Sequence, residues 1–270
     1  MDQFLYTKFI MSQVSTIIPF YNGNDTIARA IDSVIDSPLC LEVIVMVDAS
    51  TDKLSLSDTQ RAHVTAGKLR IIESNTNLGQ AAMRNMGVSV SLAPFVSFMD
   101  QDDMYMPMFC EEMSAVLLQR PELAAVECGA EIFKNGMNVL DAPDPRYFTA
   151  MNSVPWNVLV RRNAFWQAGA FPVDPEFRKK LAGEDIAFKQ AIKHYFAVGT
   201  DYSRQLLRHH LRDGSATDNY INRTEIVDGQ IVFKEVFENE ASGEWNDALQ
   251  RHWSGVTRDI TMLRALTQLN

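Results

Sequence analysis

Short apolar runs alternate with helix-forming segments along the first hundred residues. Four runs rich in β-branched and aromatic side chains have the length of buried strands and cover residues 14–19, 41–47, 69–72 and 95–99. Segments of helical composition lie between them, at residues 26–35, 59–66 and 80–88. This alternation predicts an α/β fold, with a mainly parallel, Rossmann-like sheet flanked by helices.

The pattern is more mixed after residue 101. It predicts helices at residues 107–119, 162–168 and 184–195, and a strand pair at 124–133 and 137–140. Residues 141–153 are rich in turn-forming side chains, and we interpret them as a loop.

The last fifty residues are predicted to be helical from residue 221 to the end. Apolar or aromatic positions recur there at intervals of three or four residues, namely at Trp245, Leu249, His252, Val256, Ile260 and Leu263. We favour a helix that packs on the catalytic body. A seam between two copies of the chain and a face lying on a membrane are the alternatives.

Composition narrows the class of protein. The 270 residues are 46% hydrophobic and 22% charged, as in globular proteins, and the net charge of −9 argues against a nucleic-acid binder that neutralises phosphates. No apolar window is long enough for a transmembrane helix, and the N-terminus does not have the pattern of a signal peptide. Three cysteines without a CxxC pair favour a cytoplasmic location and argue against cysteine-bound zinc.

The strongest chemical signal follows the fourth predicted strand, which leads directly into Asp100, Asp102 and Asp103. Ligands of open parallel sheets bind at the carboxyl ends of the strands, where these side chains would lie. Carboxylates of this kind suit Mg²⁺ or Mn²⁺ together with a diphosphate, and such a metal can stabilise a departing nucleoside diphosphate. A solvated turn is the simpler alternative.

A second signal is the pair Glu184 and Asp185 after Gly183, at the start of a predicted helix. The pair can simply complement the helix dipole. An ionised carboxylate at this position can also act as a general base that accepts a hydroxyl proton. The chain has neither the GxGxxG motif of nicotinamide-binding proteins nor the GxxxxGK[ST] phosphate loop, so readings as a dehydrogenase or P-loop ATPase are disfavoured.

Five segments, taken in order, resemble family 2 glycosyltransferases. They are residues 14–22, 47–52, 77–87, 98–103 and 183–185. The resemblance implies a GT-A fold for a catalytic domain at 14–215, divided into a nucleotide-binding half (14–103) and an acceptor half (104–215). An N-terminal extension (1–13) would precede this domain, and a helical C-terminal region (216–270) would follow it.

The resemblance also implies an inverting, metal-dependent transfer of a sugar from a nucleotide donor, usually a UDP-sugar. It assigns the donor to Pro19, Tyr21, Asp48, Arg84, Asp100 and Ser215. It assigns Mn²⁺ or Mg²⁺ to Asp102 and His210, the catalytic base to Asp185, and supporting roles to Asp103, Glu184 and Arg208. The chain departs from the family pattern at Val47, which stands where a second acidic residue usually precedes Asp48.

We therefore predict a cytoplasmic enzyme that adds single sugars to a saccharide or lipid-linked acceptor in cell-surface polysaccharide, glycolipid or glycoprotein assembly. Peripheral attachment to the inner face of the membrane and a homo-oligomer formed through the C-terminal helices remain open. Two other functions are compatible with the same carboxylates. One is a metal-dependent nucleotidyltransferase, and the other is a nucleotide-sugar binding protein without catalytic activity.

Overall fold

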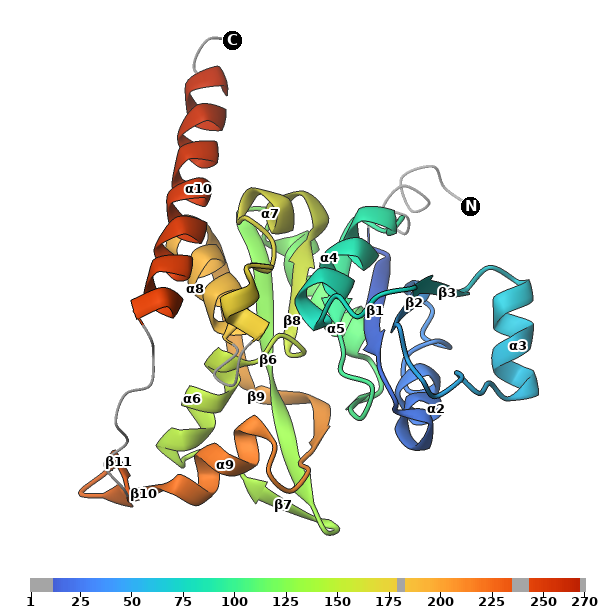
Figure 1. Cartoon of the computed structure of the whole chain (residues 1–270), viewed down its shortest axis with the longest axis horizontal. Helices are drawn as coiled ribbons and strands as arrows, with labels where there is room; N and C mark the ends of the chain where they lie inside the picture. The colour runs from blue at the N-terminus through green and yellow to red at the C-terminus, as the bar shows by residue number, and fades with distance from the viewer. Residues whose placement is uncertain (1–11, 179–182, 235–242, 268–270) are drawn as a thin grey trace.

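The computed structural model describes residues 12–178, 183–234 and 243–267, and within them nine strands form one sheet (Figure 1). These strands are β1 (Val14–Phe20), β2 (Cys40–Asp48), β3 (Leu69–Ser74), β4 (Phe95–Phe98), β5 (Met104–Tyr105), β6 (Leu123–Lys134), β7 (Met137–Leu140), β8 (Val158–Arg161) and β9 (Ala197–His210). Their order is β3-β2-β1-β4-β8-β6-β9-β5, and β7 pairs with β6 at the side.

Helices flank this sheet. They are α2 (Asn24–Asp32), α3 (Asp58–Thr65), α4 (Gln80–Val90), α5 (Phe109–Gln119), α6 (Pro145–Ser153), α7 (Arg162–Gln167), α8 (Glu184–Tyr195), α9 (Ala216–Arg223) and α10 (Gly243–Thr267), with a 3₁₀ turn at Pro175–Arg178. No helix in the described parts of the chain combines the length and the apolar character needed to cross a membrane.

The first four strands are parallel, as the strand–helix alternation predicts: β1 pairs with β2 and β4, and β2 pairs with β3. Neighbouring side chains of a strand point to opposite faces of the sheet. Ile17 and Ile18 of β1 are both fully buried but belong to two different apolar clusters, so helices cover both faces. One helix lies so close that a Cβ added at Gly87 of α4 would be 2.5 Å from Ile17 Cγ2. The α/β class is therefore confirmed.

The second half of the chain adds antiparallel pairs to the parallel ones. Strand β8 runs antiparallel between β4 and β6, whereas β9 runs parallel to β6 along most of its length. The strand pair predicted at 124–133 and 137–140 is present as β6 and β7. The short strand β5, which follows the Asp100–Asp103 turn, pairs with the end of β9 and so joins the two halves.

The prediction of a loop over 141–153 is wrong in its second part, where α6 begins at Pro145. The Asp144 carboxylate accepts a hydrogen bond from the Arg146 backbone N–H at 2.8 Å, and proline occupies the first helical turn. The residues that indicated a turn are thus the start signal of a helix.

The prediction of continuous helix from residue 221 is also wrong. Helix α9 ends at Arg223, and a two-stranded hairpin of β10 (Thr224–Val227) and β11 (Gln230–Phe233) follows. Asp228 and Gly229 join the strands with φ of 51° and 76°, as a two-residue hairpin turn requires. This Asp-Gly pair between apolar residues was the signal that periodicity alone did not capture.

Helix α10 packs on the body, beside α7, α8 and the 3₁₀ turn (Figure 1). Val256 and Ile260 are buried, and a Cβ added at Gly169 would be 2.2 Å from Val256 Cγ2. The preferred interpretation of the C-terminal helix is confirmed at these positions. The side chains of Trp245 and Leu263, and residues 1–11 of the predicted N-terminal extension, lie outside the described residues.

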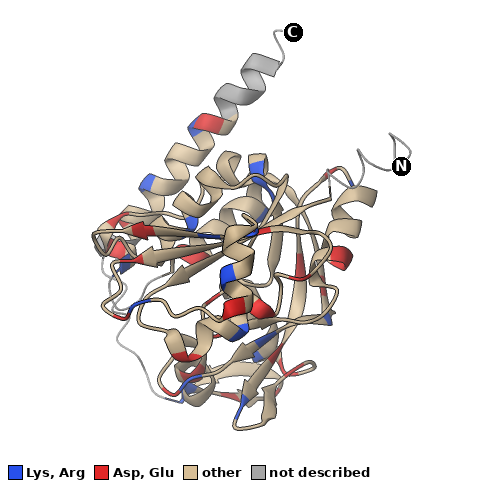
Figure 2. Ribbon diagram, turned by 90° about the vertical axis from the view of Figure 1, so that its right-hand side faces the viewer, with Lys and Arg blue, Asp and Glu red and all other residues tan. Residues whose placement is uncertain are grey.

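Acidic and basic residues are interspersed along the ribbon in the view of Figure 2. A buried group of them fixes α8 to the sheet: Lys189 Nζ lies 3.1 Å from Glu127 Oε1, and Lys193 Nζ lies 2.8 Å from Glu127 Oε2. Lys189 Nζ also donates to the Met151 carbonyl of α6 at 2.5 Å. Both lysines follow Asp185 on the same helix, so this network sets the position of the predicted base relative to β6 and α6.

Candidate active site

A pocket of about 500 Å³ joins the Asp100–Asp103 turn, the start of α8 and the loop between β9 and α9. Its lining includes Gln80, Asp100, Asp102, Val154, Trp156, Asp185, Ile186, His209, His210, Arg212, Ser215 and Tyr220. Five of the predicted site residues therefore share one cavity, although they are separated by up to 115 positions in the sequence. These five are Asp100, Asp102, Asp185, His210 and Ser215.

The acidic turn after β4 has the donor set of a divalent cation site. Ligand oxygens of Asp100, Asp102 and Asp103 all lie within 4.8 Å of one another. Asp103 is fully buried, and its carboxylate accepts the His210 backbone N–H at 3.0 Å and contacts His209 Nδ1 at 2.8 Å. Asp103 thus holds the end of β9, which leaves Asp100 and Asp102 as the carboxylates that fit Mg²⁺ or Mn²⁺.

Burial and charge shift the titration of this turn. Burial raises the pKa of Asp102, and Asp100 adds to this effect while Arg212 opposes it. Burial also raises the pKa of Asp103 to about 6, against the opposing effect of His209. For His209, burial favours the neutral ring, but the Asp103 carboxylate outweighs it and the pKa is raised.

His210 lines the pocket but is not part of the carboxylate cluster found among the described residues. Burial, with a contribution from Arg29, lowers the pKa of His210 to about 4, so the imidazole is neutral near pH 7. Its Nε2 atom is buried and has no hydrogen-bond partner in the structure. A neutral ring with an unpartnered nitrogen has the chemistry of a ligand, but its metal role stays a prediction.

The predicted base is placed by the turn that opens α8. Gly183 has φ of 102°, a left-handed conformation that favours glycine, and Asp185 follows in the first helical turn. The Asp185 side chain keeps 18% of its surface exposed and lines the pocket. Burial raises the pKa of Asp185 to about 8, while the Arg84 guanidinium acts in the opposite direction.

Arg84 is fully buried and connects the two acidic elements of the site. Its Nη1 lies 2.8 Å from Asp185 Oδ1, and its Nη2 lies 2.7 Å from Asp100 Oδ1. Burial opposes the charged form, but these carboxylates outweigh it and raise the pKa of Arg84. The resemblance assigns Arg84 to the donor, where it would face the nucleobase or the diphosphate. The structure instead places it behind the carboxylates, and it is not among the residues that line the pocket.

Two further predicted residues have clear local partners. Glu184 is buried, and its Oε1 accepts a hydrogen bond from Gln80 Nε2 at 2.5 Å. Gln80 itself lines the pocket, so Glu184 orients part of its wall. Ser215 caps α9 by accepting the Asp218 backbone N–H at 3.2 Å.

The residues predicted to hold a nucleoside lie outside this pocket. Asp48 is buried, and its two oxygens accept the backbone N–H groups of Leu78 and Gly79 at 2.6 and 2.8 Å. It therefore braces the loop between β3 and α4. Pro19 lies within β1, and Tyr21 is 48% exposed just after it.

Arg208 is also engaged away from the pocket. Its Nε lies 2.6 Å from Glu131 Oε2, and its guanidinium carbon lies 4.4 Å from the centre of the Phe133 ring. Arg208 is not among the pocket-lining residues, and its supporting role stays a prediction.

Arg212 and Trp156 of the pocket, and Gln101 of the neighbouring acidic turn, were not identified from the sequence. Arg212 Nε lies 2.5 Å from Asp102 Oδ2, the Trp156 ring stacks on His209 with centroids 5.0 Å apart, and the Gln101 side chain bonds to the backbone of Tyr21. Arg212 and Trp156 stand in no recognised motif. Gln101 lies within the 98–103 segment, between the carboxylates of the acidic turn.

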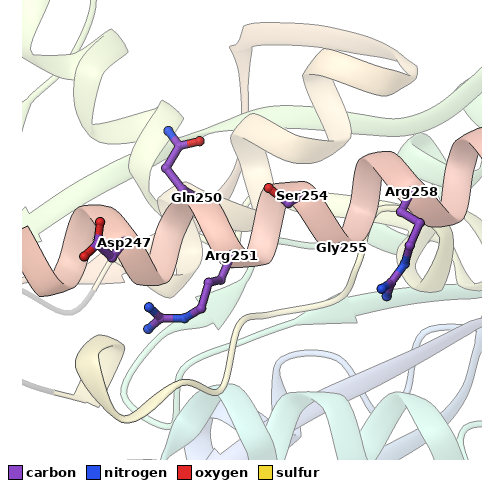
Figure 3. A pocket seen from close by; sticks show the side chains of 6 residues that line it. All are labelled: Asp247, Gln250, Arg251, Ser254, Gly255 and Arg258. Carbon is purple, nitrogen blue, oxygen red and sulfur yellow. The ribbon is translucent and has the colours of Figure 1, made fainter.

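A second pocket, of about 690 Å³, lies along α10 and is lined by Asp247, Gln250, Arg251, Ser254, Gly255 and Arg258 (Figure 3). Arg251 and Arg258 extend from the same side of the helix in this view, and Arg251 Nη2 lies 2.9 Å from Asp174 Oδ2. This pocket contains none of the predicted site residues.

Known proteins resemble parts of the chain. The succinoglycan biosynthesis protein ExoU of Rhizobium meliloti is 38% identical over 96 residues, which are 36% of this chain and 28% of that protein. The putative glycosyltransferase EpsH of Bacillus subtilis is 24% identical over 211 residues, which are 73% of this chain and 60% of that protein. The matches thus span less than two thirds of either relative.

Solved structures show the same fold. The crystal structure of residues 1–349 of TarS from S. aureus superimposes with a TM-score of 0.58 at 18% identity, over 73% of this chain and 60% of that one. At this identity the likeness concerns the fold, which is the predicted GT-A fold. The sequence pattern described as Glycosyl transferase family 2 matches residues 15–168, more than half of the chain. The chain therefore belongs to glycosyl transferase family 2.

Proposed function

We propose that the protein transfers a single sugar from a UDP-linked donor to a hydroxyl group of an acceptor, with inversion at the anomeric carbon. The observation that carries this proposal is the shared pocket, which Asp185 enters from α8 while Asp100 and Asp102 enter from the turn after β4. Base and leaving-group sites must face one cavity for such a displacement. Support for UDP comes from TarS, which has crystal structures in complex with UDP and with UDP-GlcNAc.

In this proposal Asp185 accepts the proton of the attacking hydroxyl. A carboxylate whose pKa is raised toward neutrality is a stronger base than an exposed one, provided that it is ionised at the working pH. Arg84 holds the Asp185 carboxylate by one oxygen and keeps it aligned with Asp100. The hydroxyl then attacks from the side of α8, and the diphosphate leaves toward the acidic turn, which inverts the configuration.

Asp100 and Asp102 would hold Mn²⁺ or Mg²⁺, with His210 as a further candidate ligand. When bound, such an ion neutralises the charge that develops on the leaving diphosphate. The chain itself supplies the orientation, because Asp103 bonds to His209 and to the His210 backbone and so fixes β9 beside the turn.

The acceptor would enter along the apolar wall of the same pocket. Ile186 and Tyr220 line this pocket and keep part of their surface exposed, so they offer aliphatic and flat surface against which the C–H face of a sugar ring can pack. We therefore favour a saccharide acceptor, either free or linked to a lipid. ExoU and the amylovoran biosynthesis glycosyltransferase AmsB of Erwinia amylovora are named for polysaccharide biosynthesis, which supports a role in surface polysaccharide assembly.

The test is a panel of nucleotide sugars titrated into the protein by calorimetry in the presence of Mn²⁺. We expect at least one UDP-sugar to bind, and Asp102→Asn to weaken that binding because it removes a metal-directed charge. Asp201→Asn is the matched control, since this aspartate is half exposed on β9 and does not line the pocket. Binding of no nucleotide sugar, or release of pyrophosphate from a nucleoside triphosphate, would reject the proposal.

A further inference from the structure

The positively charged side chain of Arg212 forms an ion pair with Asp102, a carboxylate of the acidic turn that could bind a metal. Arg212 Nε is 2.5 Å from Asp102 Oδ2, although Arg212 stands in the loop between β9 and α9, about a hundred residues further along the chain. The two side chains differ in environment. That of Asp102 is 7% exposed, whereas that of Arg212 is 69% exposed.

The loop that carries Arg212 is held at both ends. The Leu211 backbone N–H donates to the Phe133 carbonyl at 2.9 Å, and the Ser215 backbone N–H donates to the Arg212 carbonyl at 3.1 Å. Asp218 Oδ2 accepts the Gly214 backbone N–H at 2.9 Å. The backbone is therefore fixed, and the long, largely exposed Arg212 side chain can leave Asp102 only by rotation about its own bonds.

A divalent cation and a guanidinium group repel each other and compete for the same carboxylate oxygen. An ion bound by Asp102 would therefore displace Arg212 from it. Arg212 lines the pocket together with His210 and Ser215, on the side where the leaving diphosphate would lie. A guanidinium group is well suited to bind phosphate oxygens in a bidentate manner, so the displaced side chain has a second partner close by.

We propose that Arg212 is the internal counter-ion of Asp102 in the free protein and moves to the donor diphosphate when metal binds. This makes the binding of metal and of nucleoside diphosphate interdependent. Metal alone binds weakly because it must break the Arg212–Asp102 pair, and the diphosphate recovers that loss by pairing with Arg212. By linkage, metal raises the affinity for UDP by the same factor. The inference rests on the proposed function for the class of ligand.

The experiment titrates Mn²⁺ into the wild type and Arg212→Gln, first without nucleotide and then with saturating UDP, by calorimetry and by the electron paramagnetic resonance signal of free Mn²⁺. We expect Arg212→Gln to bind Mn²⁺ alone about tenfold more tightly, a change of about 1.4 kcal/mol. The factor by which UDP improves Mn²⁺ binding should shrink by about tenfold or more. Arg212→Lys keeps the charge and should bind Mn²⁺ alone as weakly as the wild type.

Arg204→Gln is the matched control, because this exposed arginine of β9 pairs with Glu112 and does not line the pocket. It should leave both Mn²⁺ affinities unchanged. The inference is overturned if Arg212→Gln binds Mn²⁺ alone no more tightly than the wild type, or if the effect of UDP is the same in both. If UDP and Mn²⁺ bind together in the wild type while Arg212→Gln behaves identically, only this inference fails. If neither binds, the proposed function fails as well.

Discussion

Replacement of Arg84 by methionine removes the guanidinium that lies between the two acidic elements of the site. The Arg84 side chain is fully buried, at 2.7 Å from Asp100, 2.8 Å from Asp185 and 4.0 Å from Glu184. Methionine retains much of the volume but leaves these carboxylates without the cation that balances them. We therefore expect a loss of stability that originates from charge and not from a cavity.

The size of the loss follows from the burial of the partners. The Glu184 and Asp185 side chains are 3% and 18% exposed, so water compensates little for the missing cation. Removing one partner of a buried ion pair costs about 3–5 kcal/mol of unfolding free energy. By contrast, Arg61→Met should cost less than about 0.5 kcal/mol, since Arg61 and Asp58 form an exposed pair within one helix.

The loss should also depend on pH in a definite direction. The pKa of Asp185 in the folded protein is about 8, well above its usual value, and removal of Arg84 raises it further. The folded state then holds protons that the unfolded chain has released, so stability falls as pH rises from about 4 through the folded pKa. The difference between Arg84→Met and the wild type should therefore be larger at pH 8 than at pH 5.

Urea denaturation at these two pH values measures the effect. A loss at pH 8 as small as that of Arg61→Met, or a loss that is larger at pH 5 than at pH 8, would refute the reasoning about Arg84.

Three other predictions concern the base, the sheet and the buried lysine. Turnover should rise with pH toward a plateau above about 8 as Asp185 ionises. Asp185→Asn should lower turnover by about 10²–10⁴ while UDP affinity barely changes. Wild-type turnover in this variant would reject Asp185 as the base. Gly87→Ala should lower the unfolding free energy by about 1–3 kcal/mol, because its Cβ would be 2.5 Å from Ile17 Cγ2; an unchanged urea midpoint would contradict this contact. Lys189→Met should lower the unfolding free energy by about 3 kcal/mol in the same assay, since it leaves buried Glu127 with Lys193 as its remaining lysine partner. An unchanged unfolding free energy would show that the network does not stabilise the fold.

The first half of the fold, residues 14–103, was predictable because its strands and helices carry continuous local signals. The second half was predictable only in part. Helices α5, α7 and α8 and the β6–β7 pair had local signals. Its longest strand, β9, was missed because it is rich in polar residues and is stabilised by pairing with β6 over seventy residues away in sequence. Helix α6 and the β10–β11 hairpin had local signals in Asp144-Pro145 and Asp228-Gly229, which composition and apolar spacing did not register.

The residues of the candidate site also differ in whether the sequence could reveal their positions. Asp102 and Asp185 stand in local motifs, and the structure brings them to one pocket. The positions of Arg84 and Arg212 depend on partners across the fold, so no sequence spacing could reveal that one lies behind the carboxylates and the other on Asp102. Long arginine side chains reach several alternative partners, and the tertiary structure selects among them.

The most direct test of the account is the stereochemistry of sugar transfer from an α-linked UDP-sugar, followed by proton NMR of the anomeric position. A single displacement assisted by Asp185 predicts that the β-configured product appears first, with Mn²⁺ or Mg²⁺ present. The same experiment with Asp185→Asn should give little product of either configuration. An α-configured first product would contradict the account, because it would require a mechanism other than direct attack from the side of α8.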